Sequence, residues 1–273
     1  MMSRLSKTWL WSGYAFLYLP ILWLVVFSFN GGQLASLWGG FSLRWYRETV
    51  HDAEIIDGLL CSLKIAFLSA SASVVLGTLA GWVMARYTRF KGRSLFIAHI
   101  NAPLVVPEVI TGVSLLLFFV STQKLFGLPG ERGLFTIWVG HTSIFASYAA
   151  VIIHSRLSAL DRSIEEAAMV LGARPLQVFF LVVLPMISQA LMSAWLLTFT
   201  LSLDDVVSTA FLSGPGTTTL PIVIFSRMRL GLKPSVNVVA TLTVAVVAAG
   251  IVFATLWMAR RERLRNRVEP VGA

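Results

Sequence analysis

Residues 163–186 read SIEEAAMVLGARPLQVFFLVVLPM and lie between two strongly apolar parts of a 273-residue chain. The stretch opens with a polar segment, contains a glycine and a proline, and then becomes apolar. Ser163 and Glu166 have the S-x-x-E spacing of a capping box, which favours a helix start there. Gly172 tolerates the left-handed conformation that ends a helix, and Pro175 opposes continuation of the same helix. The pattern therefore predicts a short helix that leads into an apolar segment.

The composition indicates a membrane protein. Hydrophobic residues make up 56% of the chain and charged residues 13%, and the mean hydropathy is +0.78. These values are far too apolar for a soluble domain of this size. A transmembrane helix needs about 20 mostly apolar residues, and six stretches qualify. We predict an all-α polytopic membrane protein that forms one domain over 1–273, with six transmembrane helices near 9–29, 60–85, 95–121, 134–154, 182–201 and 236–258.

The distribution of Lys and Arg predicts the orientation. With a cytoplasmic N-terminus, the inner segments hold 14 of the 22 basic residues, as expected because cytoplasmic loops are enriched in positive charge. Both termini and the short helix near 163–172 are then cytoplasmic, whereas segments 31–59 and 202–235 face outward. The first apolar stretch follows basic residues, as a signal peptide does, but it is long for one and ends in SFNGG, a poor cleavage site. We expect it to be a retained span.

The chain offers little for metal, redox or nucleotide chemistry. Its single cysteine, Cys61, cannot form an internal disulfide or a thiolate cluster. The phosphate-binding motif GxxxxGK[ST] is missing, since GPGTTT at 214–219 lacks the lysine. The net charge of +9 includes an arginine-rich tail, RRERLRNR, which is most simply the stop after the last span, with nucleic-acid binding a remote alternative. We expect no metal and no cofactor. The four histidines, His51, His99, His141 and His154, show no metal-ligand spacing.

The opening stretch also carries a family motif. Its series Glu166-Ala167-Ala168, Gly172 and Val182-x-Leu184-Pro185 resembles the EAA motif, EAA-x3-G-x9-I-x-L-P, of the membrane subunits of bacterial ATP-binding-cassette (ABC) importers. The only departure is a valine for isoleucine, which nearly conserves volume. The resemblance implies a type I ABC importer transmembrane domain, whose short helix docks on a separate ATPase subunit that binds ATP and Mg. The coupling residues that it implies are Glu165, Glu166, Ala167, Ala168 and Gly172.

A second resemblance concerns the substrate. Residues 202–242 contain SLDD, SGPG, TTLP and a G-x-x-P-x-x-N-x-x-A-T series, and they resemble the corresponding region of spermidine/putrescine importer permeases. This resemblance implies an inner-membrane subunit that does no covalent chemistry and carries a polyamine delivered by a periplasmic binding protein. It also implies pairing with a second, different permease, although self-pairing stays open. Permeases for ferric iron or other cations share parts of the pattern. The implied contact with the binding protein is the turn Ser213, Gly214, Pro215 and Gly216.

Three acidic residues are candidates for a polyamine pathway, because ammonium groups bind carboxylates and methylene chains suit aromatic or aliphatic walls. Asp204 and Asp205 lie near the outer end of the fifth predicted span, where they either contact the cation or simply end the helix. Glu108 follows Pro107 well inside the third predicted span, where a carboxylate costs on the order of 2–3 kcal/mol. We expect Glu108 either to face the pathway or to be neutral and hydrogen-bonded.

Other polar and small residues have simpler expected roles. Gly77 and Gly81 have GxxxG spacing, which predicts close packing with a neighbouring helix. In the outer segment, the acidic residues near position 50 predict a solvated charged face or an acidic mouth. Trp45 there, like its neighbour Tyr46, is expected at the membrane interface rather than in an ammonium cage. A short interfacial helix is expected within 221–232, with Arg227 and Arg229 near lipid phosphate or a partner.

Two other functions also fit six spans with a buried glutamate. A gradient-driven transporter or channel would need no ATPase, and it would make the EAA match accidental. A membrane receptor or assembly factor would carry no solute at all. The requirement for ATP and for a binding protein separates these functions from an importer.

Overall fold

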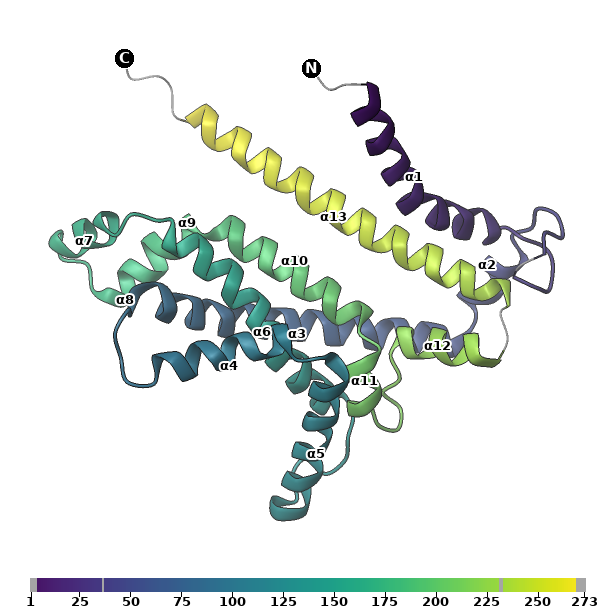
Figure 1. Cartoon of the computed structure of the whole chain (residues 1–273), viewed down its shortest axis with the longest axis horizontal. Coiled ribbons are helices and arrows are strands. Elements are labelled where there is room, and N and C mark those ends of the chain that lie inside the picture. Colours follow the sequence, from purple (N-terminus) through teal and green to yellow (C-terminus); the bar gives the residue numbers. More distant parts are fainter. Residues whose placement is uncertain (1–3, 36, 231–232, 269–273) are drawn as a thin grey trace. The chain divides into compact units, whose positions relative to one another are not determined.

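The computed structural model describes residues 4–35, 37–230 and 233–268, and it is helical apart from one isolated β-bridge between Asn30 and Phe41. Contacts divide the chain into two compact units, residues 1–58 with 222–273 and residues 59–221. The single domain over 1–273 stays a prediction. Figure 1 shows the elements in chain order. They are α1 (Arg4–Phe27), α2 (Arg44–Val50), α3 (Ala53–Arg86), α4 (Arg93–Val105), α5 (Glu108–Phe126), α6 (Leu134–Ser158), α7 (Ser163–Val170), α8 (Pro175–Val178), the π-helix η1 (Phe179–Val183), α9 (Leu184–Met186), α10 (Ser188–Asp204), α11 (Val207–Leu212), α12 (Leu220–Leu230) and α13 (Pro234–Val268).

Helix α6 is the centre of the 59–221 unit. It packs against α4, α10 and α11, and the glycines of α3 lie directly on it. A Cβ on Gly77 would be 2.5 Å from the Cβ of Ala149, and one on Gly81 would be 2.9 Å from the backbone nitrogen of His154. Real Cβ atoms do not approach that closely, so both positions need glycine. The close packing expected from the GxxxG spacing is therefore confirmed.

The predicted third span is wrong as a single helix. The chain breaks at Val106 and Pro107, so that α4 ends at Val105 and α5 begins at Glu108. Proline removes a backbone donor and disfavours helical geometry in the residue before it, which explains a break at this point. The predicted span at 182–201 is also bent, by 71° between Pro175–Met186 and Ser188–Asp204.

The described residues contain four helices that are long and apolar enough to cross a membrane, or five if the bent pair is one span. The four are 6–27, Ala53–Arg86, Glu108–Phe126 and Leu134–Ser158. The last predicted span contributes a shorter apolar stretch, Pro234–Gly250, within α13. The apolar segments found in the sequence are thus all helical, while two of them depart from straight spans.

In the other unit, α13 packs against α1 and α2. The prediction for Trp45 is wrong: its side chain is buried and donates from Nε1 to the carbonyl of Gly32 at 3.1 Å, so it holds the loop after α1 in place. The hydroxyl of Tyr46 lies 2.6 Å from Oγ of Ser28. Both aromatic side chains therefore stabilise the segment between α1 and α3.

The expected helix within 221–232 is present as α12, but Arg227 has partners inside its own unit. It forms ion pairs with Asp52 and Glu54, and the distance to Oδ2 of Asp52 is 2.7 Å. The hydrogen bond from Arg227 lowers the pKa of the Asp52 carboxyl below its usual value. Arg229 instead lies over the ring of Phe225, 4.5 Å from its centroid. Part of the expected solvated acidic face is therefore neutralised by α12.

Candidate substrate pocket and coupling helix

The break between α4 and α5 opens one side of a pocket in the 59–221 unit. The pocket has a volume of about 320 Å³ and lies among the start of α5, the middle of α6, and the junction of α10 with α11. Glu108, Asp204 and Asp205, the three carboxylates proposed from the sequence, all line it. Residues that are far apart in the chain are thus gathered at one site.

The position of Glu108 differs from the prediction. It is the first residue of α5, directly after the N-cap Pro107, and its side chain is exposed rather than enclosed within a continuous span. A carboxylate in the first turn of a helix is stabilised by the helix dipole. The break therefore places the Glu108 carboxyl at the start of a helix instead of inside a continuous span.

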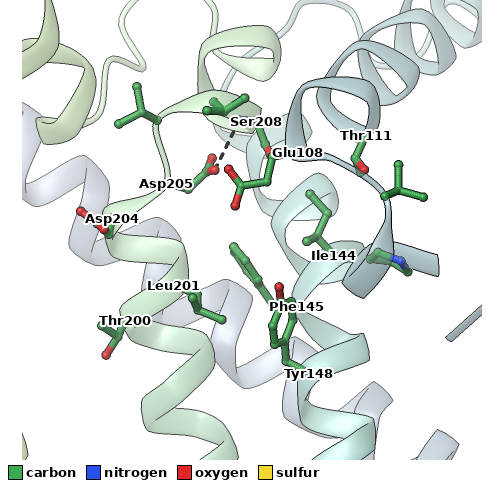
Figure 2. A pocket seen from close by; sticks show the side chains of 14 residues that line it. Glu108, Thr111, Ile144, Phe145, Tyr148, Thr200, Leu201, Asp204, Asp205 and Ser208 are labelled. Carbon is green, nitrogen blue, oxygen red and sulfur yellow. Dashed lines mark hydrogen bonds between the residues drawn. The ribbon is translucent and has the colours of Figure 1, made fainter. Parts of the chain in front are cut away.

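Asp205 is held much more tightly than Asp204. Asp204 is the last residue of α10 and is exposed. Asp205 follows it and accepts hydrogen bonds from the first turn of α11, including the backbone N–H of Thr209 at 2.7 Å. Figure 2 shows the carboxylates of Glu108 and Asp205 turned toward each other, and that of Asp204 turned away from them.

The electrostatics of the pocket favour a cation. Among the described residues that line it, three are acidic and none is basic. Phe145 and Tyr148 extend from α6 toward the carboxylates (Figure 2), and aromatic faces attract cations. The hydroxyl groups of Thr111, Thr200 and Ser208 add further hydrogen-bonding groups. The arrangement can bind positive charge at one end and a hydrocarbon chain along an apolar wall.

The short polar helix is present as α7, at the opposite end of the unit from α11 (Figure 1). Its predicted end is confirmed, because Gly172 has φ +92° and the N–H of Ala173 bonds to the carbonyl of Ala168 at 3.1 Å. Its predicted start near Ser163 is confirmed too, but the predicted capping box is wrong, since Arg162 occupies the N-cap position. Ser163 is already helical and donates its N–H to Oδ1 of Asp161 at 3.0 Å, so no capping box with Glu166 forms.

The predicted coupling residues divide into inward and outward groups. Glu165 forms an ion pair with Arg86 at the end of α3, and its side chain is only 17% exposed. Ala168 packs against the core. Glu166 and Ala167, by contrast, are exposed on α7. They lie beside the strongly exposed apolar side chains of Val170 and Leu171. Only the outward group is available to a docking partner.

Two arginines tie α7 to the membrane helices. Besides Glu165, Arg86 bonds to the carbonyl of Leu157 near the end of α6, at 3.1 Å. Arg162, the residue before α7, donates to the carbonyl of Ala85 at 2.7 Å and to that of Arg86 at 3.3 Å. Cations at a helix C-terminus satisfy its free carbonyls and complement the dipole. The base of α7 is therefore fixed to the ends of α3 and α6.

Residues 77–267 match the family described as "Binding-protein-dependent transport system inner membrane component". The chain belongs to this family. It is therefore an inner-membrane permease of a binding-protein-dependent ABC importer, which works with an ATPase, a partner permease and a binding protein. It is a non-catalytic, multi-pass membrane subunit. A gradient-driven transporter, a channel or a receptor is not supported.

The permease is similar to several known proteins. It is 51% identical over 257 residues to the putrescine transport system permease protein PotI of Escherichia coli strain K12, covering 93% of this chain and 91% of that protein. It is 34% identical to the spermidine/putrescine transport system permease protein PotC of Haemophilus influenzae, covering 93% and 97%.

Solved structures show the fold of the permease. A bacterial ABC transporter that imports the acidic polysaccharide alginate matches with a TM-score of 0.69 at 16% identity, over 94% of this chain and 98% of that chain. The methionine transporter MetNI matches with a TM-score of 0.63 at 22% identity, over 76% and 95%. The predicted type I importer fold is thus confirmed.

The turn predicted to contact a binding protein follows α11. Gly216 has φ +71°, as expected for a tight turn, and Pro215 and Gly216 are exposed. Ser213 and Gly214 are half-buried, and a Cβ on Gly214 would lie 1.9 Å from the carbonyl oxygen of Arg132. Half of the predicted contact therefore packs within the permease, and its role stays a prediction.

Sequence reasoning missed several residues around both sites. At the pocket these are the aromatic wall and the buried partners of Asp205, and at α7 they are the two arginines. His141 carried a usable signal, since it is an ionisable residue within an apolar span and such residues tend to be functional. The missed residues are Phe145, Tyr148, His141, Ser202, Thr209, Arg86 and Arg162.

Proposed function

We propose that the permease carries putrescine or a closely related polyamine through the pocket at the junction of α5, α6, α10 and α11. The observation that carries this proposal is the acidic lining without a basic residue among the described ones. Putrescine has an ammonium group at each end of a short hydrocarbon chain. Glu108 and Asp205 are suited to one of these ammonium groups, and Phe145 and Tyr148 to the methylene chain. The 51% identity to a putrescine permease supports the same substrate class.

In this proposal the permease forms half of the pathway, and a second, different permease forms the other half. The exposed face of α7, with Glu166, Ala167 and Val170, docks on the ATPase. Glu165 serves α7 differently, because its ion pair with Arg86 holds the helix to α3. Gly172 supports coupling by ending α7 sharply. The turn Ser213, Gly214, Pro215 and Gly216 contacts the binding protein through its two exposed residues.

The substrate is tested with the full complex, made of the permease, its partner permease, the ATPase and the binding protein, in proteoliposomes. We expect putrescine uptake that requires both ATP and the binding protein, and we expect putrescine to stimulate ATP hydrolysis. Spermidine and ferric iron serve as alternative substrates in parallel reactions. Stimulation by ferric iron but not by either polyamine would overturn the polyamine assignment while leaving the importer intact.

The proposed orientation places both termini and α7 in the cytoplasm, and the turn after α11 in the periplasm. It is tested with single cysteines in a Cys61→Ser background. Leu171 is 88% exposed and Pro215 is exposed, so both L171C and P215C can react in isolated permease. In intact spheroplasts, a membrane-impermeant maleimide is expected to label P215C only, and L171C only after lysis. The reverse pattern would invert the topology.

A further inference from the structure

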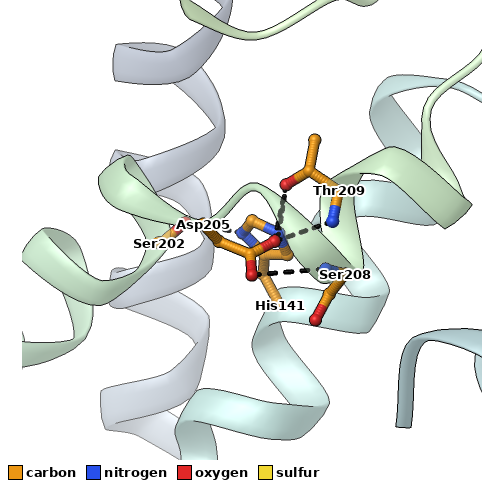
Figure 3. Close-up of polar contacts among 5 residues, drawn as sticks. All are labelled: His141, Ser202, Asp205, Ser208 and Thr209. Carbon is orange, nitrogen blue, oxygen red and sulfur yellow. Dashed lines mark hydrogen bonds and ion pairs between the residues drawn. The ribbon is translucent and has the colours of Figure 1, made fainter. Parts of the chain in front are cut away.

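His141 is a buried ionisable residue to which the proposed pathway assigns no task. Its side chain is fully buried on the packed face of α6, two turns after the start of the helix. Nδ1 of the ring lies 2.8 Å from Oγ of Ser202 on α10. Nε2 lies 3.1 Å from Oδ2 of Asp205 and 2.9 Å from Oγ1 of Thr209 on α11. The ring thus joins α6 to both elements that form the pocket's acidic corner (Figure 3).

The hydrogen bonds of Asp205 are distributed unequally between its two oxygens. Oδ2 accepts the backbone N–H and the hydroxyl of Thr209, each at 2.7 Å, and it also lies against Nε2 of His141. Oδ1 accepts the N–H of Ser208, at 3.3 Å, and no other hydrogen bond from the described residues. A carboxylate oxygen has two lone pairs. Oδ2 is therefore saturated by the protein, whereas Oδ1 keeps capacity for a ligand in the pocket that Asp205 lines.

One tautomer of His141 fits all of these contacts. Nε2–H donates to the Asp205 and Thr209 oxygens, while Nδ1 accepts the hydroxyl of Ser202. In that tautomer each ring nitrogen has a hydrogen-bond partner. Ser202 then fixes the ring orientation, and the ring fixes the carboxylate. Hydrogen bonds of this kind to a carboxylate favour its ionised form.

We propose that His141 is a positioning residue for substrate passage: it holds Asp205 by Oδ2 so that Oδ1 stays directed at the cation. This inference rests on the proposed function, in which Asp205 contacts the polyamine. Glu108 shares the pocket with Asp205, and a like charge favours protonation or displacement of a carboxylate. The donors from Thr209 and His141 oppose both effects. His141 itself need not touch the substrate.

The test compares two substitutions, each of which keeps a polar group at the position of one ring nitrogen. The amide of Asn reaches the position of Nδ1, and the amide of Gln reaches that of Nε2. His141→Gln retains a donor for Asp205, whereas His141→Asn retains only the contact with Ser202. Initial rates of ATP-dependent putrescine uptake are measured in the full complex at saturating binding protein. We expect H141Q within about twofold of wild type and H141N lower by about fivefold.

A double-mutant cycle shows whether His141 acts through Asp205. Asp205→Asn is expected to reduce uptake about tenfold, and H141N combined with D205N is expected to be no worse than D205N alone. A purely structural role would make the two losses multiply, and that result would overturn the inference. If H141N transports at the wild-type rate while D205N is defective, the inference about His141 is also overturned. The proposed function is unaffected by that result. Wild-type uptake by D205N would contradict the proposed function itself.

Assembly is checked by copurification of the ATPase with each variant. If H141N does not assemble, Ser202→Ala gives a second route, because it releases Nδ1 of the ring without touching Asp205. We expect S202A to reduce uptake about threefold and to lose this effect in the D205N background. An unchanged rate in S202A, or the same fractional loss in both backgrounds, would overturn the positioning role.

Discussion

Neutralising all three pocket carboxylates, by Glu108→Gln, Asp204→Asn and Asp205→Asn together, is expected to reduce putrescine uptake at least about a hundredfold. Hydrogen bonds to charged groups contribute about 1.5–3 kcal/mol each, and two such contacts give about 3 kcal/mol or more. The pocket supplies no other described charge to replace them. The measurement is the initial rate of ATP-dependent uptake by the reconstituted complex, with the amount of assembled permease determined in each preparation.

Glu131→Gln is the matched control for this experiment. It makes the same chemical change at an exposed carboxylate outside the pocket, and uptake is expected to stay near wild type. Among the single variants, D204N is expected to have the smallest effect, because its carboxylate turns away from the other two (Figure 2). Undiminished uptake by the triple variant would remove the pocket from the pathway.

Arg86→Gln is expected to separate ATP hydrolysis from transport. The substitution leaves the largely buried carboxylate of Glu165 unpaired and removes a donor from the carbonyl of Leu157. Loss of one partner from a buried ion pair costs on the order of 3 kcal/mol. The exposed face of α7 is unchanged, so the ATPase still docks. We expect ATP hydrolysis within about twofold of wild type, with uptake reduced about tenfold or more.

Arg89→Gln provides the control, since Arg89 is exposed in the loop three residues further on. It should leave both rates unchanged. Glu165→Gln should be milder than R86Q, because a neutral amide still accepts a hydrogen bond from Arg86. If hydrolysis and uptake fall by the same factor in R86Q, the ion pair supports assembly rather than coupling, and the mechanical role of this contact is wrong.

The sequence predicted the features that depend on local chemistry. The apolar segments became helices because their composition requires it in a membrane. Gly172 ended α7 as expected because only glycine adopts φ +92° at little cost. Gly77 and Gly81 packed closely because small residues permit it. In each case the cause lies within a few residues of the effect.

Features that depend on partners far away in the chain were harder to predict from the sequence. His141 meets Ser202 and Asp205 across more than 60 positions of sequence, and no local pattern indicates that pairing. Glu165 was predicted to be a coupling residue, but in the fold it pairs with Arg86 at the end of α3. Pro107 is a local sequence signal for the break before Glu108. However, a proline within an apolar helix can also bend the helix without breaking it. Only the packed structure decides between a kink and a break.

The position of α6 has a mechanical consequence. Leu157 accepts the bond from Arg86 near one end of this helix, and His141 holds Asp205 sixteen residues earlier, about 24 Å away along the helix axis. A helix is stiff along its length, and the glycines of α3 pack closely against α6 along the intervening turns. On the proposed coupling route, an axial displacement imposed on α6 at its Leu157 end is transmitted along the helix to His141, which contacts Asp205. In the proposed function, the ATPase would therefore change the contact between His141 and Asp205 by moving one rigid helix, without a series of side-chain rearrangements.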